Sequence, residues 1–124
     1  MKIHIDLIHH SINPPPIPAE DRETGAQLEF RGIVREIEDG KAIAGLNYEA
    51  YEPMARAMLE RILNELSAEY SCDEVCLMHR LSFVPVGETA LFARVRSRHR
   101  KAALHLMDAL IDRVKKDVPI WKMV

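Results

Sequence analysis

The chain has 124 residues, 48% of them apolar, and a net charge of −2, which is typical of a single globular domain with one core. No stretch approaches the roughly 20 consecutive apolar residues that cross a bilayer, so the composition excludes a membrane-spanning helix. The first six residues alternate polar and apolar side chains, unlike the apolar run of a signal peptide, and we expect a cytoplasmic protein.

The N-terminal segment predicts one strand and an irregular connector. Residues 2–8 alternate apolar and polar side chains, which is typical of a strand. Prolines crowd residues 13–18, and because proline fixes φ and lacks an N–H, this stretch can be neither a helix interior nor a central strand. We expect an extended connector there, followed by a short helical turn over residues 19–24.

The next segment predicts a hairpin. Residues 26–35 alternate in the same way and predict a strand. The pair Asp39-Gly40 favours a tight turn because both residues tolerate positive φ. We therefore expect residues 42–51 to return as the partner strand.

The second half of the chain alternates helix, strands and helix. Pro53 opens a helix with apolar residues spaced three and four apart, and residues 74–84 and 88–97 predict two strands. Residues 100–117 predict a second helix, which Pro119 ends because the residue before a proline disfavours helical backbone. This order indicates a single α+β domain over the whole chain, with two main helices packed on a mostly antiparallel sheet.

Positive charge is concentrated near the C-terminus. Residues 1–93 hold 8 Lys/Arg and 16 Asp/Glu, whereas residues 94–124 hold 9 and 3. Such a basic segment suits a phosphate, a nucleic acid or a partner's acidic tail, although a solvated helix face gives the same pattern. His99 and Arg100 at the start of the second helix could bind an anion, because backbone N–H groups there lack partners.

Other kinds of site find little support. His4, His9 and His10 lack a ligand-like spacing, and no glycine-rich phosphate loop is present, so we expect neither a metal nor a cofactor. Cys72 and Cys76 are separated by three residues, which is not a redox or zinc spacing, and we expect reduced thiols. A nucleic-acid-binding module stays open as an alternative, since a basic tail carrying an aromatic residue can contact bases and phosphates.

Four segments carry a more specific signal. They are Gly25-Ala26 through Phe30-x-Gly32-x-Val34-Arg35; Gly45-Leu46-Asn47-Tyr48-Glu49-Ala50-Tyr51; His79-Arg80-Leu81 with Val86-Gly87-Glu88; and His99-Arg100, Ile111-Asp112-x-x-Lys115 and Val118-Pro119-Ile120-Trp121-Lys122. In order and spacing they resemble the signatures of the molybdopterin synthase large (catalytic) subunit family, which has an α/β-hammerhead-like fold. Residues 1–24, the first strand and its proline-rich connector, match nothing in that family.

The resemblance implies an enzyme of molybdenum cofactor biosynthesis. It implies a cyclic pyranopterin monophosphate substrate, a molybdopterin dithiolene product, and no membrane or nucleic-acid partner. The sulfur donor is the C-terminal Gly-Gly thiocarboxylate of a small ubiquitin-like sulfur-carrier subunit. Two large subunits form a homodimer within a heterotetramer.

Site residues are carried over by position. The resemblance implies Lys115 and Lys122 as catalytic residues and Phe30 as a residue lining the pocket. It implies a substrate-binding set of Ile33, Val34, Arg35, His99, Arg100, Lys115, Lys122, Met123 and Val124.

Two features qualify this assignment. His99 and Lys115 are 16 positions apart on one predicted helix, on the order of 24 Å, so we expect His99 and Arg100 to reach the site from the neighbouring subunit. Family members often carry an Asn/His-rich turn after the arginine, whereas this chain has the acidic run 36–39. Acidic side chains that pointed inward would disfavour a phosphate, so an inactive homologue that only binds the partner also stays open.

Overall fold

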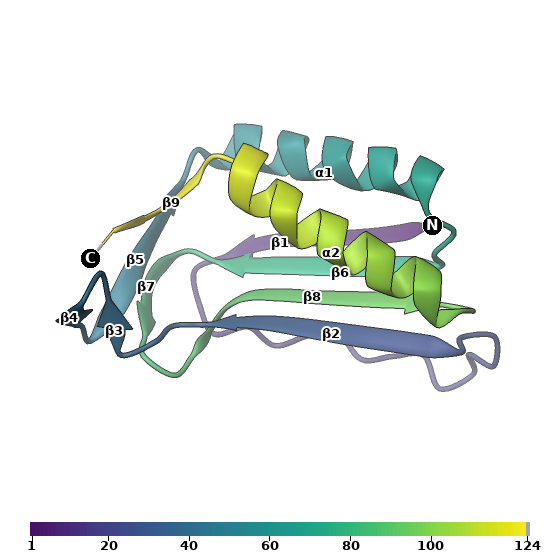
Figure 1. The fold of residues 1–124 in the computed structure, drawn as a ribbon, viewed down its shortest axis with the longest axis horizontal. Coiled ribbons are helices and arrows are strands. Elements are labelled where there is room, and N and C mark those ends of the chain that lie inside the picture. Colours follow the sequence, from purple (N-terminus) through teal and green to yellow (C-terminus); the bar gives the residue numbers. More distant parts are fainter. Residues whose placement is uncertain (124) are drawn as a thin grey trace.

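The main sheet is built from four strands rich in apolar residues. The computed structural model describes residues 1–123, and in it these strands lie in the order β1-β6-β8-β2 (Figure 1). β1 pairs with β6 in parallel, and the other two pairs are antiparallel. β6 and β8 are buried at nearly every position, as expected for central strands covered on both faces. The bounds are β1 Lys2–Ile8, β2 Ala26–Ile33, β6 Glu74–Arg80 and β8 Thr89–Ser97.

Two helices cover one face of this sheet (Figure 1). α1 spans Glu52–Glu69 and has Pro53 in its first turn. The N–H groups of a first turn have no partner within the helix, so proline, which lacks an N–H, costs no hydrogen bond there. α2 spans Arg100–Asp117 and ends just before Pro119. Their apolar faces pack on the sheet to form the main core, whose buried members include Leu59, Ile62, Leu63, Leu66, Val75, Leu77, Ala93, Val95, Leu106 and Leu110.

A second, three-stranded sheet lies at one end of the main sheet (Figure 1). It has the order β7-β5-β9, with bounds β5 Gly45–Ala50, β7 Ser82–Pro85 and β9 Ile120–Met123. A Cβ at Gly45 would lie 2.5 Å from both the Val84 carbonyl oxygen and the Phe83 ring, so glycine permits β5 and β7 to pair closely. A two-residue hairpin, β3 Ile37–Glu38 and β4 Lys41–Ala42, lies beside this sheet.

The α+β prediction is confirmed, but the predicted strand pairing is wrong. Asp39 and Gly40 do form the predicted turn, with φ values of 52° and 77°. The ladder that it closes is only two residues long, however, and β5 pairs with β7 and β9 whereas β2 pairs with β8. The turn signal is local and specifies only the bend. The pairing of β5 is set by its residue Leu46, which is buried with Val84 of β7 in a second, smaller core.

Two smaller expectations also change. The predicted strand 74–84 is divided into β6 and β7, because Ser82 adopts φ of 70° and redirects the chain into the second sheet. The predicted helical turn at 19–24 is instead a turn in which Asp21 accepts hydrogen bonds from the N–H groups of Glu23 and Thr24. These side-chain bonds replace the backbone bonds that a helix would have made.

The connector between β1 and β2 packs on the sheet face opposite the helices. Ile12 contacts the small core of Cys76 and Phe92, and the Arg94 guanidinium donates to the Pro15 carbonyl oxygen at 2.9 Å. Cys72 and Cys76 are both free and buried, and burial raises the pKa of the Cys76 thiol to about 11. No helix in residues 1–123 has the length and apolar character of a membrane span.

Asp21 anchors this connector and should make stability depend on pH. Its carboxylate lies 2.9 Å from the guanidinium of the buried Arg96. Hydrogen bonds from the Thr24 hydroxyl and the Glu23 N–H lower its pKa from 3.8 to about 2. A carboxyl with a lower pKa in the folded state stabilises the fold above its unfolded pKa, and this contribution is lost as the pH falls toward 2.

We therefore expect Asp21→Asn to be less stable than the wild type at neutral pH. The two free energies of unfolding should converge as the pH falls from about 4 to about 2, because both side chains are then neutral. Urea unfolding at a series of pH values measures this. A difference that stays constant down to the lowest pH would show that the carboxylate charge is not responsible.

Candidate active site

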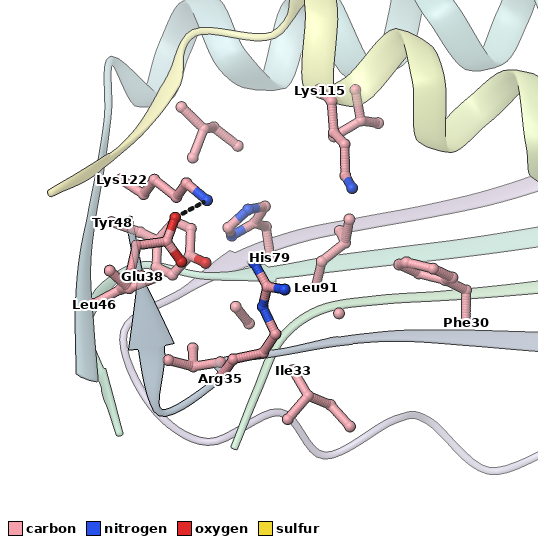
Figure 2. A pocket seen from close by; sticks show the side chains of 15 residues that line it. Phe30, Ile33, Arg35, Glu38, Leu46, Tyr48, His79, Leu91, Lys115 and Lys122 are labelled. Atoms are coloured by element: carbon pink, nitrogen blue, oxygen red, sulfur yellow. Dashed lines mark ion pairs between the residues drawn. The ribbon is translucent and has the colours of Figure 1, made fainter. Parts of the chain in front are cut away.

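A cavity of about 500 Å³ opens where the main sheet, the end of α2 and the second sheet meet (Figure 2). Its apolar walls come from the end of β2, from β8 and from the second sheet, and include Phe30, Ile33, Leu46 and Leu91. Its polar side chains are Arg35, Glu38, Tyr48, His79, Lys115 and Lys122. Apolar walls with a few convergent polar groups are typical of a small-molecule site.

Three cations reach this cavity from three different elements. Arg35 follows directly after β2, Lys115 lies in the last turn of α2, and Lys122 lies on β9 opposite Tyr48 of β5. Figure 2 shows the three side chains around a common space. The end of β2, two residues before Arg35, and the end of α2, which carries Lys115, bring residues that are 80 positions apart in sequence to one cavity. Such a set of fixed charges binds anions, and the planar fork of arginine suits phosphate or carboxylate oxygens.

One carboxylate lies among these cations. Glu38, on the β3–β4 hairpin, accepts a bond from the Lys122 ammonium at 2.8 Å, and its side chain is only 11% exposed. The hydrogen bond from Lys122 lowers the pKa of Glu38, and the charge of Arg35 adds to this effect. Glu38 is therefore ionised at neutral pH, and it partly neutralises the cavity.

His79 contributes a neutral polar group to the cavity. Its Nδ1–H donates to the Arg80 carbonyl oxygen at 2.8 Å, so the lone pair of the neutral ring lies on Nε2. Burial lowers the pKa of His79, which keeps the imidazole uncharged at neutral pH. The ring meets Tyr48 edge-on at 5.1 Å between centroids, and burial raises the pKa of the Tyr48 hydroxyl.

The cavity brings together six of the predicted site residues, and three other described ones do not line it. Phe30, Ile33, Val34, Arg35, Lys115 and Lys122 all line it. His99 and Arg100 lie at the opposite end of α2 and do not line it, and Met123 is on β9 but is also not among its lining residues. Val124 lies outside the described residues.

The sequence alone assigns no role to three of the polar residues that line the cavity, Glu38, Tyr48 and His79. Glu38 was noted only as part of an acidic run, and Tyr48 and His79 only as members of the segments that carry the resemblance. His79 had a usable signal, because a histidine near the end of an otherwise apolar, buried strand requires a polar partner or a site. Within residues 1–123, no group of three His, Cys, Asp or Glu side chains is arranged to hold a metal.

Comparison with known proteins identifies the family. A family model described as MoaE protein matches residues 5–117, so the expectation that residues 1–24 match nothing in the family is wrong for residues 5–24. The chain belongs to the MoaE family. Solved structures agree with this: the chain superposes on a Staphylococcus aureus molybdopterin synthase with a TM-score of 0.77 and 32% identity, covering 98% of this chain and 87% of the other.

Further relatives of this MoaE-family chain carry one name. The molybdopterin synthase catalytic subunit of Bacillus subtilis is 44% identical over 103 residues, which are 83% of this chain and 66% of the relative. That of Arabidopsis thaliana is 40% identical over 100 residues, 81% of this chain and 50% of the relative. The chain therefore spans about half to two thirds of the length of these relatives.

A complex structure is also similar. A Helicobacter pylori protein–protein complex of subunits 1 and 2 of molybdopterin-converting factor includes a chain that is 31% identical, with a TM-score of 0.67 and coverage of 82% of this chain and 66% of the other. In this MoaE-family member, the cavity with its three cations is the candidate active site.

Proposed function

We propose that this chain is the catalytic subunit of a molybdopterin synthase. It transfers sulfur from the thiocarboxylated C-terminus of a small ubiquitin-like sulfur-carrier subunit to cyclic pyranopterin monophosphate, and so forms the molybdopterin dithiolene. The observation that carries the proposal is the convergence of Arg35, Lys115 and Lys122 on one cavity. The names of the related catalytic subunits support it.

The cavity suggests a division of roles. Arg35 binds the phosphate of the pterin through its planar fork of donors, while Phe30 and the apolar wall hold the ring system. Lys115 is the principal catalytic residue, because its ammonium lines the cavity and pairs with no carboxylate among residues 1–123. Lys122 assists as a second cation. Ile33 and Val34 shape the wall beside the phosphate.

The chemistry fixes the stoichiometry. A dithiolene contains two sulfur atoms and each thiocarboxylate supplies one, so every product molecule consumes two carrier chains. In each transfer a pterin carbon exchanges a bond to oxygen for a bond to sulfur. The acyl carbon of the carrier exchanges its bond to sulfur for a bond to oxygen, which forms the carrier's terminal carboxylate. Proton transfers accompany these steps, and a positioned lysine can serve as their acid and base.

We further propose that two such chains form a homodimer with a small subunit at each end. Arg100 and His99 lie at the far end of α2 from Lys115, so one chain alone does not bring them to its own cavity. They complete the site of the neighbouring subunit instead. Met123 and Val124, which follow Lys122 in sequence, belong to the same proposed substrate-binding set.

A complementation experiment tests this shared site. Lys115→Ala and Arg100→Ala should each be inactive alone, yet a mixture that exchanges subunits should recover about a quarter of wild-type activity, because each mixed dimer contains one intact site. A mixture that stays inactive, with subunit exchange verified by mass spectrometry, would mean that both residues serve the site of their own chain, and full activity of Arg100→Ala alone would mean that Arg100 serves no site.

The nucleic-acid alternative loses support from the location of the basic residues. Arg94 and Arg96 are buried under the connector, and Arg113 pairs with Glu65. Lys122 points into the cavity. The basic C-terminal quarter is therefore not a continuous surface for many phosphates. The buried free thiols agree with a reducing compartment, and we propose a cytoplasmic location.

The proposed activity is tested by reconstitution. The purified chain, a thiocarboxylated small subunit and the pterin precursor should together give the dithiolene product, and omission of any component should give none. A well-folded chain that binds the small subunit and forms no product would identify an inactive homologue.

A further inference from the structure

The Glu38 carboxylate forms an ion pair in the cavity with Lys122, a cation that an anionic substrate would bind. Lys122 is one of three cations lining the cavity, and its Nζ is 2.8 Å from Glu38 Oε1. Figure 2 shows this ion pair on the side of the cavity next to β5 and β9, with Arg35 nearby. An anionic substrate that entered the cavity would find the Lys122 ammonium already paired, and the negative charge of Glu38 would repel it.

Glu38 lies on a short hairpin that can move away from Lys122. It lies on a hairpin whose strands are two residues each, closed by the Asp39-Gly40 turn. This hairpin belongs to neither of the larger sheets, so its movement breaks no strand pairing of those sheets. The Lys122 side chain is 54% exposed, so water competes with Glu38 for the ammonium and weakens the ion pair on that side.

We propose that Glu38 is a built-in competitor at the anion site, a specificity-determining residue that occupies Lys122 until an anionic group of the substrate displaces it. This rests on the proposed function of the cavity. The displacing group is a cluster of anionic oxygens, which either the pterin phosphate or the carrier's C-terminus supplies. Glu38 thereby lowers affinity for simple anions, which cannot offset the lost ion pair with further contacts.

Titration with inorganic phosphate tests the proposal without any turnover. Glu38→Gln keeps the side-chain size but removes the charge, and the phosphate dissociation constant should fall about tenfold from that of the wild type. In the wild type, phosphate should also shift the backbone amide resonances of residues 37–42, because the hairpin is released. A dissociation constant that is unchanged or higher in Glu38→Gln would overturn the proposal.

Glu36→Gln is the matched control. Glu36 lies on the same segment and is exposed, and its loss changes the net charge by the same amount. Its phosphate dissociation constant should stay within about twofold of the wild type, since Glu36 does not line the cavity and exposed charges are screened by salt. An equal gain in both variants would reveal a general charge effect and would refute displacement at Lys122.

A double variant locates the effect at Lys122. In a Lys122→Gln background, the gain from Glu38→Gln should be clearly smaller than in the wild type, because the blocked ammonium is gone. A full tenfold gain in that background would contradict a competition for Lys122.

A second ligand separates the two possible sources of the anion. Phosphate should gain affinity in Glu38→Gln in either case, and a peptide ending in Gly-Gly with a free carboxylate should gain at least as much as phosphate if the carrier's tail displaces Glu38, and less than phosphate if the pterin does. No gain for either ligand would overturn the proposal. Failure of the wild type to form dithiolene would instead count against the proposed function, and these titrations would still report on Glu38.

Discussion

Lys115→Ala should lower single-turnover sulfur transfer by two or more powers of ten and leave the melting temperature nearly unchanged. The side chain lies in the last turn of α2, is exposed toward the cavity and pairs with no carboxylate among the described residues. Its removal therefore costs little packing. Lys122→Ala should reduce transfer less, because Lys122 assists as a second cation beside Lys115.

Lys116→Ala separates catalysis from helix stability. A lysine near a helix C-terminus interacts favourably with the helix dipole, which is worth about 0.3–1 kcal/mol at either position. Lys116 is exposed on the same turn but does not line the cavity, so its alanine variant should share any small stability loss and retain turnover. Wild-type turnover in Lys115→Ala, or an equal loss in Lys116→Ala, would refute the catalytic role.

Leu106→Ala should lower the free energy of unfolding by about 2–5 kcal/mol. Leu106 is fully buried in the core between α2 and the main sheet, and its truncation leaves a cavity that the sheet cannot close. Leu104→Ala, two residues away and 51% exposed, should change the free energy of unfolding by less than about 1 kcal/mol. Urea unfolding of both variants measures this, and similar losses in the two would contradict the packing described here.

The helices could be predicted from sequence because their signals are local. Apolar spacing and Pro119 predicted residues 100–117, and the structure has α2 over Arg100–Asp117. Pairing of β5 could not be predicted in this way, since its paired residues in β7 and β9 are 34 or more positions away. A turn signal specifies only the bend, whereas burial of Leu46 with Val84 decides which strand lies alongside.

The candidate site was predictable where the resemblance supplied positions. Phe30, Arg35, Lys115 and Lys122 line one cavity, and their roles stay predictions until they are tested. Glu38 could not be placed from sequence, because only the fold shows that its side chain points inward to Lys122. The acidic run that departs from the family pattern thus contributes one residue to the site.

Transfer of radioactive sulfur tests the central claim most directly. A small subunit labelled at its thiocarboxylate is mixed with this chain and the pterin precursor, and the label is followed in a single turnover. We predict that the label moves from the carrier to the pterin dithiolene, two sulfur atoms per product, only when this chain is present, and that Lys115→Ala slows the transfer at least a hundredfold. Label that stays on the carrier in the presence of folded chain and pterin would contradict the proposed activity.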